Sequence, residues 1–382
     1  MSDKKKILIC IDWFAPGYKA GGPIRSCENI ALLLKDDYLI YILTTDTDHG
    51  ETKPHETITT NEWIHYLHHS NIQVYYARKA SLSLGQLKRV IKSVQADYIY
   101  LNSLFSPLFV LYPLWLKWSG TIKGKVIACP RGNLYDSALA IKRIKKKPFL
   151  TLFRWVGIHK MIRFQATNDR EKDAVEYYFP NSEIIVTDDP INAQQPSFIN
   201  CKKDIGSLKC IFIARIHSIK NLLFLLKILE KVKATIELTL VGPIEDMPYW
   251  ELCEEQIKLL PTNVITTYIG SLPHHELIHL LQKNHLYILP TKGENFGHSI
   301  FEAFLAGRPV LISDQTPWLG LHARKIGWDL PLAHPSAFVN ALEEAASWDQ
   351  EVFDECAANA WHFAKEHIDN SNVKAKYVAL FS

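Results

Sequence analysis

Short apolar runs alternate along this chain with longer amphipathic segments, and turn residues separate the two. In the first half, β-branched or aromatic runs predict strands at Ile7 to Ile11, Leu39 to Thr44, Ile72 to Tyr76, Tyr98 to Leu101, Lys125 to Ala128, Phe164 to Thr167 and Ile184 to Val186. The segments between several of them predict helices at Gly22 to Leu34, Gly85 to Val94 and Ser137 to Trp155. Such alternation indicates a doubly wound domain whose parallel sheet is covered on both faces.

The pattern restarts after a polar, proline-containing segment that begins at Asp188, DDPINAQQPSFINCKKD. Strands are predicted at Cys210 to Ala214, Ile236 to Val241, Val264 to Ile269, Leu286 to Leu289 and Val310 to Ile312. Helices are predicted at Asn221 to Val232, Tyr249 to Leu260, His274 to Gln282, Ser299 to Ala306, Asp349 to His367 and Val373 to Phe381.

We therefore expect two doubly wound, Rossmann-like α/β domains in tandem, at 1–190 and 208–367, joined by a linker at 191–207. The last helix, at about 368–382, is expected to pack back on the first domain. In open α/β sheets of this kind, ligands bind at the carboxyl ends of the strands.

Composition fits this organisation. A chain of 382 residues exceeds what one hydrophobic core usually supports, and an apolar content of 47% suffices for two cores. With 43 Lys and Arg against 40 Asp and Glu, the formal charge of +3 is too small to suggest a nucleic-acid partner. Seven scattered cysteines without a CxxC pair predict reduced thiols and a cytoplasmic location. The most apolar segment, Leu104 to Trp118, is shorter than the roughly 20 residues of a spanning helix.

Candidate chemistry is densest in Pro290 to Asp314, PTKGENFGHSIFEAFLAGRPVLISD. If the predicted helix begins near Phe296, Glu294 and Glu302 border one cleft at its N-terminal end. Because Glu302 lies in an otherwise apolar helix, it needs a polar partner, and a ribose diol can donate two hydrogen bonds to a carboxylate. The turn from Gly293 to Gly297 directs backbone amides toward an anion.

Two further loops carry groups suited to a phosphate. The loop Pro16 to Pro23, PGYKAGGP, contains Gly21 and Gly22, which would let backbone N–H groups approach an anion, although a tight strand-to-helix turn explains the pair equally well. It is neither GxGxxG nor a Walker loop, which disfavours a dinucleotide or ATP. In the second half, Arg215 and Lys220 of ARIHSIKN follow a strand, where two cations could neutralise a diphosphate.

Together these residues resemble a known family. Glu294 and Glu302 form the E-x7-E pattern of retaining glycosyltransferases of family 4, and ENFGHSIFEAFLAGRPVLISDQTPW is similar to their donor-binding core. With the Gly-Gly loop, the Arg215 and Lys220 pair and the tandem domains, the resemblance covers nearly the whole chain. It implies a GT-B fold, with two domains facing across a cleft, a nucleotide-sugar donor on the second domain and an acceptor on the first.

The resemblance also implies site residues. The catalytic residues would be Glu294, Arg215 and Lys220, with the two cations stabilising the leaving nucleoside diphosphate. The donor-binding residues would be Gly21, Gly22, Asn295, Phe296, Gly297, His298 and Glu302, of which Glu302 binds the ribose. It further implies transfer with retention, neither metal nor cofactor, and deprotonation of the acceptor with help from the departing phosphate.

The first domain departs from the family pattern at two positions. Asn102 and Ser103 follow a strand where many relatives have a histidine beside the transferred sugar, and Gln165 replaces another frequent histidine. This departure weakens the case for an acceptor step that depends on histidine. We take Asn102, and Arg131 at the end of a later strand, as acceptor-side candidates.

Two other patterns need an interpretation. Asp46 and Asp48 spell DxD, a metal-binding pattern in another glycosyltransferase fold, but they lie far from Pro290 to Asp314, so we expect an ordinary loop and no metal site. The segment Lys142 to Trp155 joins a basic run to aromatic residues. A solvated helix face is the ordinary interpretation, yet this composition also suits an anionic membrane surface, and we expect peripheral attachment to the inner face of the plasma membrane.

The function predicted from these features is sugar transfer from a nucleotide-diphosphate sugar to a glycan or polyprenyl-linked glycan acceptor. The resemblance suggests bacterial surface polysaccharide biosynthesis as its setting. Two alternatives remain open. A sugar-nucleotide epimerase of the same fold would need acid and base groups flanking the sugar, and a non-catalytic subunit would bind the sugar nucleotide without turnover.

Overall fold

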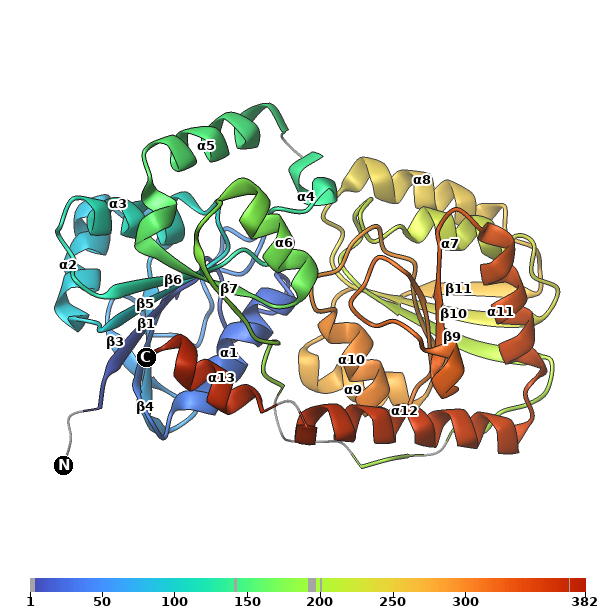
Figure 1. Ribbon diagram of the computed structural model, residues 1–382. Helices are drawn as coiled ribbons and strands as arrows, with labels where there is room; N and C mark the ends of the chain where they lie inside the picture. The colour runs from blue at the N-terminus through green and yellow to red at the C-terminus, as the bar shows by residue number, and fades with distance from the viewer. Residues whose placement is uncertain (1–3, 141–142, 192–196, 200, 371) are drawn as a thin grey trace. The chain divides into compact units, whose positions relative to one another are not determined.

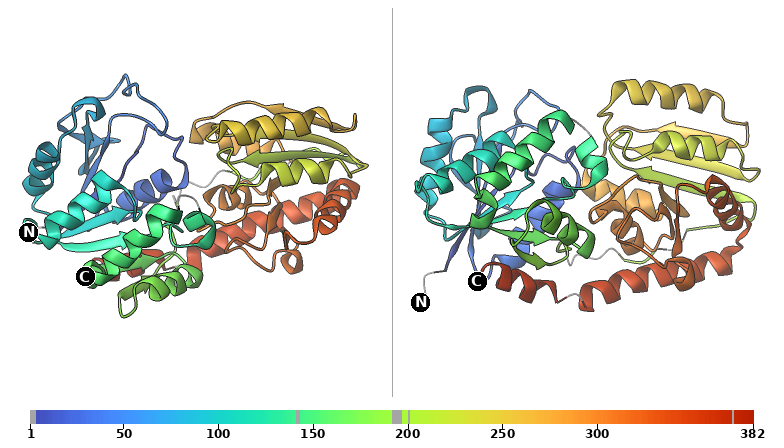
Figure 2. Two further views of the ribbon diagram at one scale, coloured as in Figure 1. Left: turned by 90° about the horizontal axis from the view of Figure 1, so that it is seen from above. Right: turned by 45° about the horizontal axis from the view of Figure 1, so that its top comes forward.

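The computed structural model describes residues 4–140, 143–191, 197–199, 201–370 and 372–382 (Figure 1). The chain divides into two compact units. Unit 1 comprises Met1–Asn192 and Asn372–Ser382, and unit 2 comprises Ala193–Ser371. Each unit has its own sheet with helices on both faces (Figure 2). The expected fold class, two Rossmann-like α/β domains in tandem, is confirmed.

The sheet of unit 1 has the strand order β3-β4-β2-β1-β5-β6-β7-β8 among the described residues. The strands are β1 (Lys6–Cys10), β2 (Leu39–Thr45), β3 (Trp63–Tyr66), β4 (His69–Ala77), β5 (Tyr98–Asn102), β6 (Lys125–Cys129), β7 (Ile162–Ala166) and β8 (Glu183–Val186). All neighbouring pairs are parallel except β3 and β4. The sequence did not predict β3, because this edge strand is short and only half-buried.

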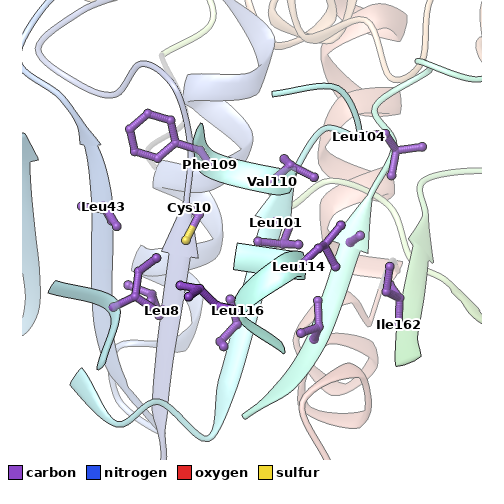
Figure 3. Close-up of a cluster of buried hydrophobic side chains, with 14 of the residues drawn as sticks. Leu8, Cys10, Leu43, Leu101, Leu104, Phe109, Val110, Leu114, Leu116 and Ile162 are labelled. Atoms are coloured by element: carbon purple, nitrogen blue, oxygen red, sulfur yellow. The ribbon is translucent and has the colours of Figure 1, made fainter. Parts of the chain in front are cut away.

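Helices cover the two faces of this sheet. The apolar cluster on one face contains Leu8, Leu101 and Phe109 (Figure 3). Five elements close it: α2 (Leu84–Val94), η2 (Pro107–Leu111), α3 (Tyr112–Trp118), α5 (Arg143–Trp155) and α6 (Asp169–Tyr178). The remaining short elements are η1 (Lys79–Ser81), α4 (Asp136–Ala140) and η3 (Ile158–Met161). The helix expected from Ser137 to Trp155 covers α5 and most of α4, and residues 141–142 between them lie outside the described part.

The opposite face is covered by α1 (Gly22–Leu34) and α13 (Val373–Leu380). Tyr377, Leu380 and Phe381 are fully buried there, and the ring of Phe381 lies 6.0 Å from that of Tyr38. The C-terminal residues are therefore part of the core of unit 1.

The sheet of unit 2 is parallel, with the order β11-β10-β9-β12-β13-β14. Its strands are β9 (Ser207–Ile213), β10 (Thr235–Val241), β11 (Val264–Tyr268), β12 (Leu286–Leu289), β13 (Val310–Ser313) and β14 (Gly327–Leu330). Its helices are α7 (Leu222–Leu229), α8 (Met247–Lys258), α9 (His274–Gln282), α10 (His298–Leu305), η4 (His322–Arg324), α11 (Pro335–Ser347) and α12 (Gln350–Asn370). Helix α7 packs on α8 and α11, whereas α10 packs on α9 and α12 (Figure 1).

Each sheet has a point where the strand order reverses. In unit 1 the chain runs from β1 toward β4 on one side and from β5 toward β8 on the other, so the reversal lies between β1 and β5. In unit 2 the corresponding point lies between β9 and β12. Open α/β sheets bind ligands outside the carboxyl ends of the strands at this switch point. We therefore expect the ligand-binding site of each unit at its switch point.

Two general expectations concern the whole chain. The seven cysteines are free thiols in the structure. Among the helices of the described residues, none has both the length and the apolar character needed to cross a membrane.

Candidate functional site

The loops after β9 and β12 meet at the switch point of unit 2. The amide of Lys292 donates to the carbonyl oxygen of Ile219 at 2.8 Å, and Thr291 Oγ1 donates to the same oxygen at 3.2 Å. These bonds fix the loop that carries Arg215 and Lys220 against the loop that carries Glu294. Residues separated by more than 70 positions in the sequence therefore share one edge of the sheet.

Lys220 and Glu294 form an ion pair in which Lys220 Nζ donates to Glu294 Oε1. Their side chains are only 17% and 13% exposed, so water screens the attraction weakly. The backbone of Glu294 is also fixed, because its amide donates to the carbonyl oxygen of Gln315 at 2.9 Å. The sequence predicted both residues for the site but not their pairing.

Arg215 pairs with a residue that the sequence did not single out. Its Nη1 lies 2.6 Å from Oε2 of Glu245, which follows β10, the strand beside β9. The loops after β9 and β10 approach so closely that a Cβ at Gly242 would lie 1.9 Å from the carbonyl oxygen of Ala214. Both cations of the candidate site are thus held by carboxylates.

Glu302 lies in α10 and is half-buried, with Oε1 3.4 Å from Nδ1 of His274. His274 is the first residue of α9, and no motif of the sequence singled it out. A polar partner was expected for this carboxylate, because it lies in an otherwise apolar helix. In the structure, His274 is such a partner. The ribose contact of Glu302 stays a prediction.

Helix α10 begins at His298, one residue before the expected Ser299, because its N-cap residue Gly297 has φ +80°, outside right-handed helical geometry. A start near Phe296, the condition under which Glu294 and Glu302 were expected to border one cleft, is not observed. Glu294 lies in the preceding loop, as expected. The ring of Phe296 is buried against Phe301 and Trp318.

Two side chains hold this turn in place. Trp318 Nε1 donates to the carbonyl oxygen of Phe296 at 2.6 Å. The hydroxyl oxygen of Tyr287, on β12, lies 2.7 Å from Ser299 Oγ. The same hydroxyl donates to the carbonyl oxygen of Ile213 at 3.2 Å. Burial raises the pKa of Tyr287 well above its ordinary value, and the nearby carboxylates add to the effect. The phenol therefore stays protonated. Asn295 and His298 are half-buried beside this turn.

At the switch point of unit 1, Asp12 follows β1 and Ser106 follows β5. Ser106 Oγ donates to Asp12 Oδ1 at 2.7 Å, and Thr45 Oγ1 donates to the backbone oxygen of Asp12 at 2.6 Å. Burial raises the pKa of the Asp12 carboxyl. Next to it, the half-buried Trp13 makes an edge contact with His49, at 4.4 Å between ring centroids. The sequence did not select Asp12 or Trp13, since only the strand order marks this position.

The acceptor-side candidates Asn102 and Arg131 contact each other. Arg131 Nε donates to Asn102 Oδ1 at 2.8 Å and Nη2 donates to the hydroxyl of Tyr100 at 2.9 Å, while Nη1 pairs with Asp189. The Arg131 side chain is only 7% exposed. All three guanidinium nitrogens have partners within unit 1, and the acceptor-side role of Asn102 and Arg131 stays a prediction.

The Gly-Gly loop and the DxD pattern also meet in unit 1. The carboxylate of Asp48 accepts hydrogen bonds from the amides of Tyr18 at 2.9 Å and Lys19 at 3.2 Å. Gly21, with φ +70°, caps α1, and its amide donates to the carbonyl oxygen of Tyr18 at 3.0 Å. Asp46 Oδ1 accepts from the amide of Lys79 at 3.0 Å. Both carboxylates thus hold loops, and Gly22 begins the helix. The contact of either glycine with a phosphate stays a prediction.

Comparison with known proteins gives the class of the fold. Residues 200–322, which contain Arg215, Lys220, Glu294 and Glu302, match the family model described as glycosyl transferases group 1. This part of unit 2 is therefore similar to glycosyl transferases of group 1. A search of the curated protein sequences found no significant match.

Solved structures extend the likeness to the whole chain. Sucrose-phosphate synthase from Thermosynechococcus elongatus superposes with a TM-score of 0.70 at 14% identity, over 99% of this chain and 98% of that one. HepE from Anabaena, in complex with UDP and glucose, gives 0.66 at 15% identity, over 98% and 99%. WaaG, a glycosyltransferase involved in lipopolysaccharide biosynthesis, gives 0.64 at 13% identity, over 98% and 99%. At these identities the likeness establishes the fold, which is GT-B.

Proposed function

We propose that this protein is a retaining glycosyltransferase that uses a nucleotide-diphosphate sugar as donor. The observation that carries the proposal is the arrangement of Arg215 and Lys220 at the switch point of unit 2, where each is held by a carboxylate. The family match across residues 200–322 supports it. So does the structure of HepE with UDP-glucose, since HepE shares the fold.

The chemistry follows from the two ion pairs. Departure of a nucleoside diphosphate concentrates negative charge, and preorganised cations stabilise such charge most where water is excluded. On donor binding, Lys220 would exchange Glu294 for a phosphate oxygen, and Arg215 would exchange Glu245. Glu294 would then accept hydrogen bonds from hydroxyls of the donor sugar, and Glu302 from the ribose.

Retention belongs to the proposal as well. The anomeric carbon would lose its bond to the phosphate oxygen and gain one to the acceptor oxygen on the same face, while the acceptor proton passes to the departing phosphate. Glu294 does not act as a nucleophile in this scheme, because its carboxylate would hold hydroxyls of the donor sugar while the acceptor oxygen forms the new bond. Arg215 and Lys220 supply the positive charge, so the scheme needs neither a metal nor a cofactor.

We place the acceptor, a glycan or a polyprenyl-linked glycan, on unit 1. The switch point there offers a half-buried carboxylate, Asp12, with one oxygen fixed by Ser106 and the aromatic ring of Trp13 alongside. Carboxylates and indole rings are suited to hydroxyls and to the apolar faces of sugars, respectively. We further propose that the enzyme acts at the cytoplasmic face of a membrane, in surface polysaccharide biosynthesis.

Product analysis tests the proposal against its alternatives. Purified protein is incubated with UDP-, GDP- and ADP-sugars and glycan acceptors, and products are followed by NMR. We expect nucleoside diphosphate release with a new glycoside of unchanged anomeric configuration, and loss of both in Glu294→Ala. Accumulation of an epimerised donor would instead favour the epimerase, and binding without turnover would favour a non-catalytic subunit.

A further inference from the structure

Three neighbouring elements of unit 1 expose apolar side chains beside cations. Helix α3 and helix α5 both contact η3, and α3 and α5 cover the same face of the sheet (Figure 1). The α3–α5 surface is defined by the exposed side chains of Trp115, Trp118, Leu152, Arg154, Trp155, Lys160 and Met161. Trp155 is the most open of them, with 84% of its surface exposed.

This exposure does not come from a poorly packed helix. Leu150 and Phe153 of α5 are buried, and the ring of Phe153 lies 5.3 Å from that of Phe179 on the sheet side. Leu152 and Trp155 remain exposed on the same helix. Because one side of α5 already closes the core, its exposed apolar residues are available for a partner outside the molecule.

The charge of the elements that form this surface is one-sided. The segments α3, α5 and η3 together contain seven Lys and Arg residues and no Asp or Glu, although the whole chain is nearly balanced. Arg154 and Lys160 are exposed on the surface itself, and Lys147 is exposed on α5. Of the cations that the sequence singled out, Lys142 lies outside the described residues, as do the side chains of Arg143 and Lys145.

We propose that the α3–α5 surface docks on an anionic lipid bilayer, with Trp155 in the headgroup region and Arg154 and Lys160 beside anionic headgroups. Indole rings prefer the membrane interface, where their apolar body and N–H group are both accommodated. Basic residues next to them gain from the negative surface potential. The charge imbalance favours this occupant over a protein partner of mixed charge.

The inference deepens the proposed function, because a polyprenyl-linked acceptor would be presented at the docked surface. Docking on lipid can nevertheless be measured independently of sugar transfer. Lipid binding does not require turnover, so failure of transfer would not remove it. Failure of docking, in turn, would leave a transferase that uses a dissolved glycan.

Co-flotation with lipid vesicles tests the docking. Full-length protein is floated with vesicles of phosphatidylcholine alone and of phosphatidylcholine with phosphatidylglycerol. We expect binding to the anionic vesicles and little to the neutral ones. A basic residue near an anionic leaflet contributes roughly a fivefold factor, so Arg154→Gln with Lys160→Gln should weaken partitioning about 30-fold. Trp155→Ser should also weaken it.

Matched controls separate docking from misfolding and from nonspecific charge effects. Lys231→Gln with Lys233→Gln removes two exposed lysines from unit 2, and Tyr177→Ser removes an aromatic side chain of unit 1 that is 76% exposed. Both should float as the unaltered protein does, and all variants should keep its melting temperature. The proposal is overturned by an unaltered protein that does not bind anionic vesicles, by surface variants that bind equally well, or by controls that lose as much.

Discussion

Lys220 and Glu294 form a weakly exposed ion pair at the switch point of unit 2, between loops that follow β9 and β12. Each residue is a candidate ligand of the nucleotide-sugar donor, yet in the absence of that donor the two side chains pair with each other. In the proposed function, a diphosphate would compete with Glu294 for Lys220, and the released carboxylate would become available for a sugar hydroxyl. This exchange would link donor binding to preparation of the site.

Glu294→Gln should separate binding from transfer. We expect transfer to fall at least about 100-fold, as when a preorganised polar contact of a transition state is removed. UDP affinity should hold or rise, because Lys220 loses its competitor. Isothermal titration and a transfer assay measure the two effects. Unchanged transfer would remove Glu294 from the catalytic residues.

Arg215→Ala should weaken nucleotide binding. Hydrogen bonds to charged groups contribute about 1.5–3 kcal/mol, so UDP affinity should fall on the order of 10- to 100-fold. Glu245→Gln is the matched control, since it keeps the guanidinium and removes only the carboxylate that pairs with it. That variant should bind UDP at least as well as the unaltered protein. Equal affinity in Arg215→Ala would contradict the assignment.

Gly297→Val should disturb the turn before α10. The residue has φ +80°, and an added Cβ would lie 2.9 Å from Cδ1 of Ile300. We expect a stability loss of at least 1–2 kcal/mol, approximately the cost of left-handed backbone, together with weaker nucleotide binding. Gly320→Val is the control, because φ is +73° there and no heavy atom lies within 4 Å of the added Cβ. If both variants bind nucleotide normally, the turn does not hold the anion.

His285 makes the stability of unit 2 depend on pH. Its Nδ1 accepts from the amide of Lys209 at 2.9 Å, and its Nε2 lies 2.8 Å from the carbonyl oxygen of Lys202. Burial lowers the pKa of His285 from 6.5 to about 4, so the folded state holds the neutral ring. The contribution is fully present above pH 6.5 and is lost as pH falls toward 4, for a total of about 3 kcal/mol.

Urea denaturation at several pH values between 7.5 and 4.5 measures this dependence. His285→Gln should be less stable than the unaltered protein at neutral pH and should lose less stability on acidification. The exposed His275 offers a control, because His275→Gln should leave the pH dependence unchanged. An identical acid slope for His285→Gln and the unaltered protein would contradict the account.

The fold was largely predictable because buried parallel strands read as short apolar runs separated by turn residues. β3, β14 and α11 were missed: β3 is short and half-exposed, and the four-residue β14 contains Gly327 and Asp329, which do not resemble an apolar strand. The start of α10, expected at Ser299, lies only one residue earlier, at His298.

The candidate site was predictable only where a residue fits a motif. Arg215, Lys220, Glu294 and Glu302 belong to recognisable patterns, whereas Glu245 and Asp12 follow strands whose neighbours are known only from the sheet order. Arg131 was selected as a cation at the end of a strand, and its three partners within unit 1 could not be read from the sequence. Pairing of charges depends on tertiary structure, which a linear motif does not contain.

The central claim is that unit 2 binds a nucleotide-diphosphate sugar through Arg215 and Lys220. A thermal-shift screen of UDP-, GDP- and ADP-sugars tests it directly, because a ligand at 100 times its Kd stabilises a protein by about 2.7 kcal/mol. We predict that at least one of these donors raises the Tm of the unaltered protein and that the shift disappears in Arg215→Ala with Lys220→Ala. No shift with any donor, or the same shift in the double variant, would contradict the account.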